Sequence, residues 1–366
     1  MVMRKFLFAL MLSVILFEFF IIDICNSSEI DIIYVNNDYD KSTEGWGINC
    51  FSKIQEAINA SYNGYTIIVY NGTYFEHINI NKSIKIIGEN DKTTIDGQNI
   101  GNIVSIISDD VTFQNFTIKN SGKNLNNSGM QIFSNNNIIT NNLIINSSIG
   151  IYLKQCSNNL VKQNNFNNNN YGIGIDYCDN KNEIDNNTIY NSSTTGIYVA
   201  HSINNEVYKN YITKSSYGIA LSFSDKNKIM YNMINDIFVD GIYLYFCDYG
   251  HILNNYIKDG ECGIKVISSN KNIIKNNIIS NFSIYGINLF HSGSNDVNKN
   301  IISNGDTGIF VASDSIDNVI NNNMFSSNNQ KIYEEPHIQK PSNIPGFEFV
   351  IIIICILFIV SRKIYR

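Results

Sequence analysis

The stretch of sequence that decides the fold spans residues 150–195 and reads GIYLKQCSNNLVKQNNFNNNNY followed by GIGIDYCDNKNEIDNNTIYNSSTT. Each half opens with a glycine and two aliphatic residues one position apart, and continues into a polar segment rich in asparagine. The glycine recurs every 21 to 24 residues, at Gly129, Gly150, Gly172, Gly196, Gly218, Gly241, Gly263, Gly286 and Gly308. A fixed period of this length without a helical pattern is typical of a β-solenoid, in which each repeat stacks on the next.

The apolar runs in each repeat alternate with a period of two residues. Ile242 and Leu244 point to one side of their strand, and Tyr243 and Tyr245 point to the other. One such strand cannot bury its apolar face, but stacked coils with strands about 4.8 Å apart bury it against one another. The sequence therefore predicts an all-β parallel β-helix, with the glycine before each strand relieving a tight bend.

One asparagine also recurs once in every repeat. Stacked one coil above another, these side-chain amides would bond to each other and hold a turn in place, so we predict a structural ladder. The alternative is a row that binds a ligand. The predicted members are Asn142, Asn165, Asn187, Asn210, Asn232, Asn255, Asn277, Asn300 and Asn322.

The N-terminal side carries a candidate cover for the sheet edge that stacking leaves exposed. Ser52 to Gln55 fits a capping box at the start of a short helix. One face of this helix is apolar and comprises Phe51, Ile54, Ala57 and Ile58. Residues 29–128 are expected to hold this cap and the first, irregular coils, and residues 129–330 the regular repeats.

Two further motifs lie in the early coils. Gly72 to Glu76 reads Gly-Thr-Tyr-x-Glu, and Thr94 to Gly97 reads Thr-Ile-Asp-Gly. With the cap and the Gly-Ile-x-Leu coils, they resemble the pectin-lyase-like right-handed parallel β-helix superfamily, and within it the NosD-type branch, over roughly residues 32–325. The resemblance implies a right-handed β-helix with an N-terminal capping helix. It implies no single activity, because this scaffold hosts lyases, hydrolases, adhesins and accessory proteins.

Both ends of the chain are apolar. Residues 1–28 are predicted to be a secretory signal peptide, with Arg4 and Lys5 before an apolar run; an uncleaved anchor is the alternative. All three prolines lie between positions 336 and 345, so residues 331–345 are expected to form a stalk. Residues 346–366 combine an apolar run with a basic tail, which predicts a transmembrane or sorting segment.

Pro345, Gly346 and Phe347 resemble the Pro-Gly-Phe C-terminal sorting signal of archaeal surface proteins. The resemblance implies an archaeal source and a tail that is cut and replaced by a lipid anchor; a plain tail anchor is the alternative. Both alternatives predict a membrane-anchored protein whose body lies at the cell surface.

The composition narrows the classes of partner and of enzyme. The formal net charge is −6, which argues against nucleic acid and anionic polysaccharide as electrostatically attracted partners. No arginine lies between Arg4 and Arg362. Pectate-type lyases of the superfamily use an arginine beside calcium-binding carboxylates, and lysine replaces it poorly.

Two small clusters are candidates for chemistry. Asp225 and Asp248 share one position of adjacent repeats, and such a pair could bind calcium or act as acid and base on a carbohydrate; a polar turn column is the alternative. Cys156 and Cys178 also share a column, and His201 follows one coil later. The two cysteines could form a disulfide or simply part of a small buried stack, and together with His201 they could form a copper(I) site.

Aromatic residues collect at outward positions two and four after the glycines. They are Tyr152, Tyr198, Tyr243, Tyr245, Phe290 and Phe310, with Asp176 nearby. Rings at repeating spacing would suit a neutral sugar chain laid along the rod, whereas ordinary tyrosine enrichment in strands is the alternative.

The sequence thus predicts a surface-anchored, non-catalytic β-helix without a resident cofactor. It would bind a polysaccharide or another surface partner, or contribute to the envelope. The two alternatives are a carbohydrate-active enzyme that works through carboxylates and a NosD-like accessory in copper-enzyme maturation.

Overall fold

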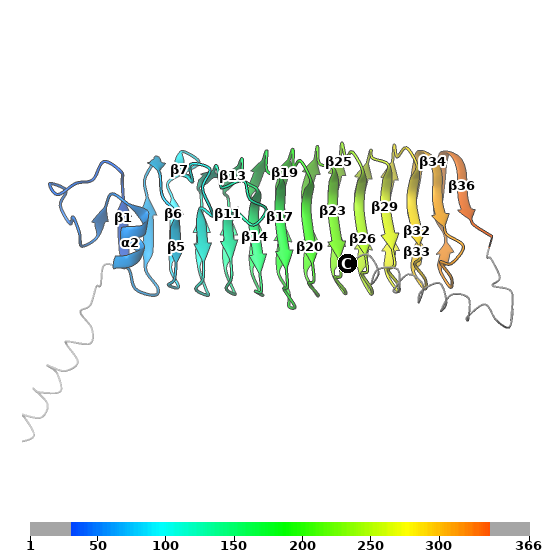
Figure 1. The fold of residues 1–366 in the computed structure, drawn as a ribbon, viewed down its shortest axis with the longest axis horizontal. Helices are drawn as coiled ribbons and strands as arrows, with labels where there is room; N and C mark the ends of the chain where they lie inside the picture. The colour runs from blue at the N-terminus through cyan, green and yellow to red at the C-terminus, as the bar shows by residue number, and fades with distance from the viewer. Residues whose placement is uncertain (1–30, 337–366) are drawn as a thin grey trace, which may run out of the picture.

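The computed structural model describes residues 31–336, which form a rod of stacked coils (Figure 1). The predicted all-β parallel β-helix is confirmed. The expected signal peptide and the anchor residues Pro345, Gly346 and Phe347 lie outside the described residues. Within residues 31–336, no helix is both long and apolar enough to cross a membrane.

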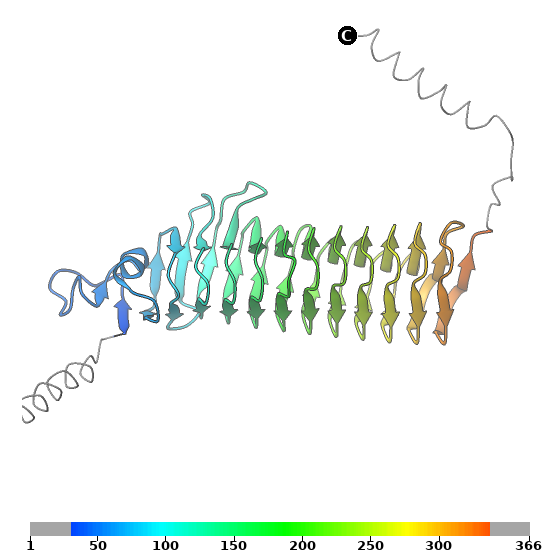
Figure 2. The same cartoon turned by 90° about the horizontal axis from the view of Figure 1, so that it is seen from below.

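Each regular coil contributes one strand to each of three parallel stacks that run along the rod (Figures 1 and 2). The first stack is a 14-stranded sheet, and the other two are joined at their C-terminal end into one 22-stranded sheet; the three stacks are called the first, second and third sheet here. The first sheet contains β2 (Cys50–Phe51), β1 (Ile32–Val35), β3 (Thr66–Val69), β6 (Lys85–Gly88), β9 (Thr112–Gln114), β12 (Ile138–Thr140), β15 (Leu160–Lys162), β18 (Glu183–Asp185), β21 (Glu206–Tyr208), β24 (Lys228–Met230), β27 (His251–Leu253), β30 (Ile273–Lys275), β33 (Asp296–Asn298) and β35 (Val319–Asn321). The second sheet contains β4 (Gly72–Tyr74), β7 (Thr93–Asp96), β10 (Thr117–Lys119), β13 (Leu143–Ile145), β16 (Asn165–Asn167), β19 (Thr188–Tyr190), β22 (Tyr211–Thr213), β25 (Met233–Asn235), β28 (Tyr256–Lys258) and β31 (Ile278–Ser280).

The third sheet is called the long-strand sheet here, because its regular strands have six residues. It contains β5 (Ile78–Ile80), β8 (Val104–Ile106), β11 (Ser128–Ile132), β14 (Ile149–Lys154), β17 (Tyr171–Asp176), β20 (Thr195–Ala200), β23 (Tyr217–Ser222), β26 (Asp240–Tyr245), β29 (Cys262–Ile267) and β32 (Tyr285–Phe290). Two strands of eleven residues, β34 (Ile301–Val311) and β36 (Met324–Glu334), pass from the second sheet into the long-strand sheet.

Aliphatic columns fill the inside of the coils, as the alternation predicts. Ile242 and Leu244 are buried, and Ile242 pairs in parallel register with Ile219 on one side and Ile264 on the other. Identical side chains therefore lie above one another at about 4.8 Å. Because each coil buries its apolar face only against its neighbours, the core is continuous along the rod.

The recurring glycines are needed for space rather than for an unusual backbone angle. Gly218 does not have a positive φ, but a Cβ atom on it would lie 2.4 Å from the carbonyl oxygen of Gly241 and 2.5 Å from Cγ2 of Ile234. The expected relief of a tight bend is therefore wrong. Glycine lets the start of each long strand approach the next coil and the core more closely than any side chain would allow.

Two asparagine ladders hold the turns on either side of the first sheet. Asn187 donates from its backbone N and from Nδ2 to Oδ1 of Asn210, both at 3.0 Å, and Nδ2 also reaches the carbonyl oxygen of Val161 at 2.9 Å. The first ladder runs through Asn142, Asn164, Asn187, Asn210, Asn232, Asn255, Asn277, Asn300 and Asn323. The second, which the sequence analysis missed, runs through Asn137, Asn159, Asn182, Asn205 and Asn227, and again through Asn272, Asn295 and Asn318.

Two predicted ladder members are wrong by one position. Asn164 is the buried ladder residue, whereas Asn165 is exposed at the start of β16. Asn323 likewise takes the place expected for Asn322. Both errors fall in runs of asparagine, where a repeat length that varies by a residue or two leaves the register open.

The helix α2 (Ile54–Ala60) covers the N-terminal end of the rod, and it buries Ile54, Ala57 and Ile58 as expected. The predicted capping box at Ser52 is wrong, because no side chain of the helix's own first turn caps it. Glu76 does so instead: its carboxylate accepts the backbone N–H groups of Ile54 and Gln55 at 2.8 and 2.9 Å. The Gly-Thr-Tyr-x-Glu motif thus ties the first coils to their cover.

We expect Asn164→Ala to lower the free energy of unfolding by roughly 2–3 kcal/mol, since it leaves the buried backbone N–H of Asn142 without its acceptor. Asn165→Ala is the matched control and should change stability by less than about 0.5 kcal/mol. Chemical denaturation of both variants checks the assignment, which equal losses would contradict.

Candidate functional site

A row of stacked aromatic rings follows one edge of the long-strand sheet. Tyr177 stacks on His201 with centroids 4.7 Å apart, His201 on Phe223 at 5.6 Å, and Phe223 on Phe246 at 5.2 Å, with interplanar angles of 8°, 2° and 6°. We call these four residues the aromatic row. Each directly follows the last residue of its strand, in β17, β20, β23 and β26.

The aromatic row is about half exposed: Tyr177 is 51 %, Phe223 52 % and Phe246 44 % accessible. All four residues have left-handed backbones, with φ between 46° and 54°. A left-handed backbone costs a residue other than glycine about 1–2 kcal/mol, and asparagine tolerates it best. Asparagine, lysine and aspartate hold most of the other left-handed turn positions, and the exposed rings of Tyr231 and Tyr249 hold two more. The aromatic row differs from these two tyrosines because its four rings are consecutive in one column and stack on one another.

The aromatic row as a group is not among the predicted binding residues. Those residues occupy positions two and four after each glycine, whereas the row occupies position five, which reads Gln155, Tyr177, His201, Phe223, Phe246, Ser268 and His291. Reading that column alone would have found the row.

The aromatic residues predicted to bind a ligand divide into two groups. Tyr152 and Phe310 are buried, at 5 % and 8 % exposure, which contradicts their expected display on the surface. Tyr152 is buried because the ring of Tyr198 covers it, with the two ring centroids 6.4 Å apart. The Tyr198 ring can take this position because it lies over Gly174, where a Cβ atom would be only 2.4 Å from Cε1 of Tyr198.

The other predicted rings remain accessible. Tyr245 contacts both Phe223 and Phe246 at steep angles of 81° and 76°, so it lies along the side of the aromatic row. Tyr243 is half-buried beside it, at 6.3 Å, and Phe290 is 39 % exposed two coils further on.

Asp176 connects the sheet face to the aromatic row. Its carboxylate accepts the hydroxyl of Tyr152 at 2.8 Å through Oδ2, and its Oδ1 lies 3.3 Å from Nδ1 of His201. Burial, reinforced by this carboxylate, raises the pKa of Tyr152 and keeps the phenol protonated. Asp176 therefore fixes the orientation of His201 within the aromatic row.

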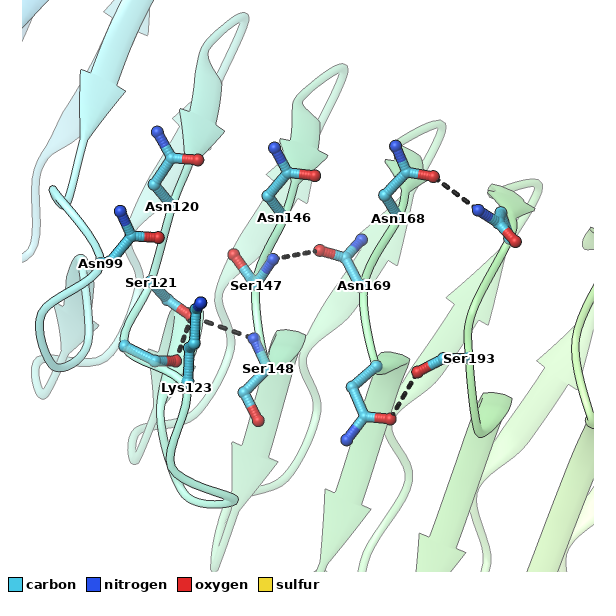
Figure 3. Close-up of a pocket in the computed structure, with 13 residues that line it drawn as sticks. Asn99, Asn120, Ser121, Lys123, Asn146, Ser147, Ser148, Asn168, Asn169 and Ser193 are labelled. Carbon is cyan, nitrogen blue, oxygen red and sulfur yellow. Dashed lines mark hydrogen bonds between the residues drawn. The ribbon is translucent and has the colours of Figure 1, made fainter.

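A polar pocket of about 580 Å³ lies at the opposite edge of the long-strand sheet, in the N-terminal half of the rod (Figure 3). Asn120, Asn146, Asn168 and Asn191 follow one another along it, and Asn191 donates to Asn168 at 2.7 Å. Lys123 is the only charged residue among those that line the pocket. Its amides offer both donors and acceptors, which suits a neutral, hydroxyl-rich ligand.

The carboxylates proposed for catalysis or calcium binding are engaged in turn contacts. Asp225 accepts the backbone N–H of Asp248 at 2.7 Å, and Asp248 accepts the backbone N–H of Asn270 at 2.6 Å. This places both aspartates in a turn column, in which each carboxylate caps the next coil.

The thiols and the imidazole proposed for copper lie on different sides of the chain. Cys156 and Cys178 are buried with their Sγ atoms 3.7 Å apart, whereas His201 is exposed and faces Asp176. Serine hydroxyls continue the buried column, as where Ser202 accepts the backbone N–H of Cys178 at 2.9 Å. In residues 31–336 no group of three or more histidine, cysteine, aspartate or glutamate side chains is placed to hold a metal ion.

One carboxylate is buried at the start of a long strand, where Asp240 is the first residue of β26. Asp240 is 1 % exposed, neither of its carboxylate oxygens makes a hydrogen bond, and its closest cation is Nζ of Lys265 at 3.6 Å. Burial raises the pKa of the Asp240 carboxyl, and Lys265 opposes that shift only in part.

Since the pKa of Asp240 is higher in the folded than in the unfolded chain, folding takes up a proton. Stability is then greatest below the unfolded value of about 3.9 and falls as the pH rises through the raised folded value. We expect Asp240→Asn to be less sensitive to pH over this window, and Lys265→Met to be more sensitive, in thermal unfolding between pH 3 and 8. If the melting temperatures of the wild type and both variants changed with pH in the same way, folding would not raise the pKa of Asp240.

Comparisons with known proteins agree with this geometry. The family model for the right handed beta helix region matches residues 49–232, 167–302 and 195–336. Similar solved structures include the Dettilon tailspike protein, at 14 % identity and a TM-score of 0.64, with 83 % of this chain and 68 % of that chain covered. The A-module of the Azotobacter vinelandii mannuronan C-5 epimerase AlgE6 has 15 % identity and a TM-score of 0.58 (79 % and 92 % covered).

A third similar structure is the GH136 lacto-N-biosidase from Eubacterium ramulus, at 12 % identity and a TM-score of 0.59, with 81 % of this chain and 68 % of that chain covered. No curated protein matches the chain significantly. At these identities the structural likeness establishes the fold alone. The family model, in contrast, covers most of the chain, and together with the stacked parallel coils it shows that this chain belongs to the right-handed β-helix family.

Proposed function

We propose that this protein binds a neutral polysaccharide along the outer face and edges of its long-strand sheet. The observation that carries the proposal is the aromatic row, whose rings are half exposed at left-handed positions where asparagine would be more stable. A contiguous exposed apolar surface of this kind typically marks a contact with a ligand or partner.

The geometry of the row indicates how a sugar chain would lie on it. Within the row each ring covers its neighbour's face, so mainly the ring edges point to solvent. Ring edges carry partial positive charge and attract oxygen atoms. Tyr245 beside the row and the amide-lined pocket across the sheet add polar and apolar contacts for a hydroxylated chain.

Electrostatics favours a neutral ligand over an acidic one. Lys265 is paired with Asp240, and Asp176 adds a negative charge beside the aromatic row. The pocket contributes one cation, Lys123. Binding an acidic polysaccharide would thus remove water from its charged groups, and few cations of the protein would compensate for that cost.

The similar structures support a carbohydrate ligand by their names, since one is a mannuronan epimerase and another a lacto-N-biosidase. The cell-surface location, the lipid or membrane anchor, the archaeal source and the NosD-type relationship also belong to this proposal. They rest on the resemblances of the terminal segments and of the repeats.

A second candidate function, catalysis on the bound carbohydrate, is favoured by one observation. Asp176 lies against Nδ1 of His201, which leaves Nε2 on the far side of the ring, and the same carboxylate holds the hydroxyl of Tyr152. A histidine oriented by a carboxylate is a common general base. It would act on a sugar that lies over the aromatic row.

The test is a titration of the full chain, in a detergent without a sugar headgroup, with hexasaccharides of glucose, mannose, xylose and N-acetylglucosamine. We expect Phe223→Ala combined with Phe246→Ala to weaken binding about tenfold or more. The matched control is Tyr231→Ala combined with Tyr211→Ala, two exposed rings away from the long-strand sheet.

Absence of binding to every sugar, or equal losses in both double variants, would contradict the proposal. Mass spectrometry of the recovered sugars separates the second candidate. Products formed by the wild type and absent with His201→Ala would establish catalysis.

A further inference from the structure

The aromatic row ends at Phe246, although its column continues. The next positions are Ser268 and His291: the backbone N–H of Phe246 donates to the carbonyl of Ile267, and that of Ser268 donates to the carbonyl of Phe290. All three residues have the same left-handed backbone, with φ of 51°, 48° and 51°. Ser268 is thus a small residue at a position that has rings on both sides.

The spacing of the coils fixes the size of this interruption. Phe246 and His291 are two coils apart, which corresponds to roughly 9–10 Å at the usual strand separation. One ring fills the same spacing within the aromatic row, where His201 lies between Tyr177 and Phe223 with centroids at 4.7 and 5.6 Å. A pyranose chair carries C–H groups on both of its faces, so it can contact an aromatic wall on each side of a space of this width.

Both walls are held in place. Phe246 is stacked on Phe223 through one face, and Tyr245 lies along the side of the two rings rather than on the opposite face. His291 is fixed by a hydrogen bond between its Nδ1 and the carboxylate of Asp314 and by a T-shaped contact with the ring of Phe290 at 4.0 Å. The far face of Phe246 therefore looks along the column toward His291.

The floor between the walls is polar. The backbone N–H of Ser268 donates to the carbonyl oxygen of Phe290, but within residues 31–336 the Ser268 hydroxyl has no hydrogen-bond partner. A hydroxyl at the base, that of Ser268, can bond a hydroxyl of a sugar whose C–H faces contact the rings.

We propose that Phe246, Ser268 and His291 form a clamp that holds one pyranose ring of the polysaccharide between the two aromatic side chains. The clamp rests on the proposed function and names its principal subsite. The inserted sugar takes the place of the missing ring and continues the stack.

The fold supplies a direct test, because the clamp can be closed without disturbing the coils. Ser268→Tyr places a ring where the column has none, in the backbone conformation that Tyr177 already adopts in the same column. Gln155→Tyr is the matched control, since it extends the other end of the aromatic row, next to Tyr177, and leaves the clamp open.

Both variants of the full chain are titrated with the same hexasaccharides, and their melting temperatures are measured. We expect Ser268→Tyr to weaken binding at least about tenfold with no loss of melting temperature, and Gln155→Tyr to leave binding within about twofold. His291→Ala, which removes one wall, should weaken binding as well.

The outcomes separate the clamp from the proposed function. Full affinity in Ser268→Tyr, together with loss in the Phe223 and Phe246 double variant, would overturn the clamp and retain the polysaccharide site. No binding by the wild type would overturn both. Equal weakening by Ser268→Tyr and Gln155→Tyr would also overturn the clamp, because any added ring would then have the same effect.

Discussion

The register between coils is the constraint on which the rest of this structure depends. Every residue of a regular coil lies about 4.8 Å from the corresponding residue of the next, so a side chain must be compatible with its own counterparts above and below. Isoleucine satisfies this condition inside the rod by packing on itself, as in the column through Ile219, Ile242 and Ile264. Asparagine satisfies it in the turns, because one amide donates while its neighbour accepts. Glycine satisfies it at the start of the long strands, where a Cβ atom would meet the next coil.

The repeat pattern was sufficient to predict the solenoid fold. It was insufficient to identify which residue within a repeat makes a given contact. Glycine spacing and period-two alternation determine a solenoid, because no other arrangement buries the apolar side of so many short strands. The ladder was misplaced at Asn165 because residues 164 and 165 are both asparagine, and only the bonds to Asn142 and Asn187 distinguish them. The helix cap was misassigned for a related reason: Glu76 is more than twenty residues from the amides that it accepts, and a local motif cannot reveal it.

The functional face was harder to predict because exposure depends on neighbours in adjacent coils. Tyr152 has an outward position, yet Gly174 leaves room for Tyr198 to lie across the sheet and cover it. Position five after each glycine looked like an ordinary turn position. Its importance appears only when the left-handed backbone and the ring stacking are seen together. Rings there stabilise one another by about 0.5–1.5 kcal/mol per pair, which offsets part of the cost of the backbone.

The same stacking that stabilises the aromatic row also limits how it can bind. A ring inside the row has both faces occupied, so a sugar can be held between two ring faces only where one ring of the column is missing. In most folds a binding site is a concavity formed by irregular loops. In a solenoid, replacing one large residue of a column by a small one leaves a gap whose width is set by two coil spacings rather than by loop conformation. Such a gap is rigid because the coils on either side are joined by continuous strand pairing, here through β26, β29 and β32. A ligand in such a gap must offer an apolar surface to the rings on both sides and a hydroxyl to the small polar residue between them, and a pyranose ring satisfies both conditions.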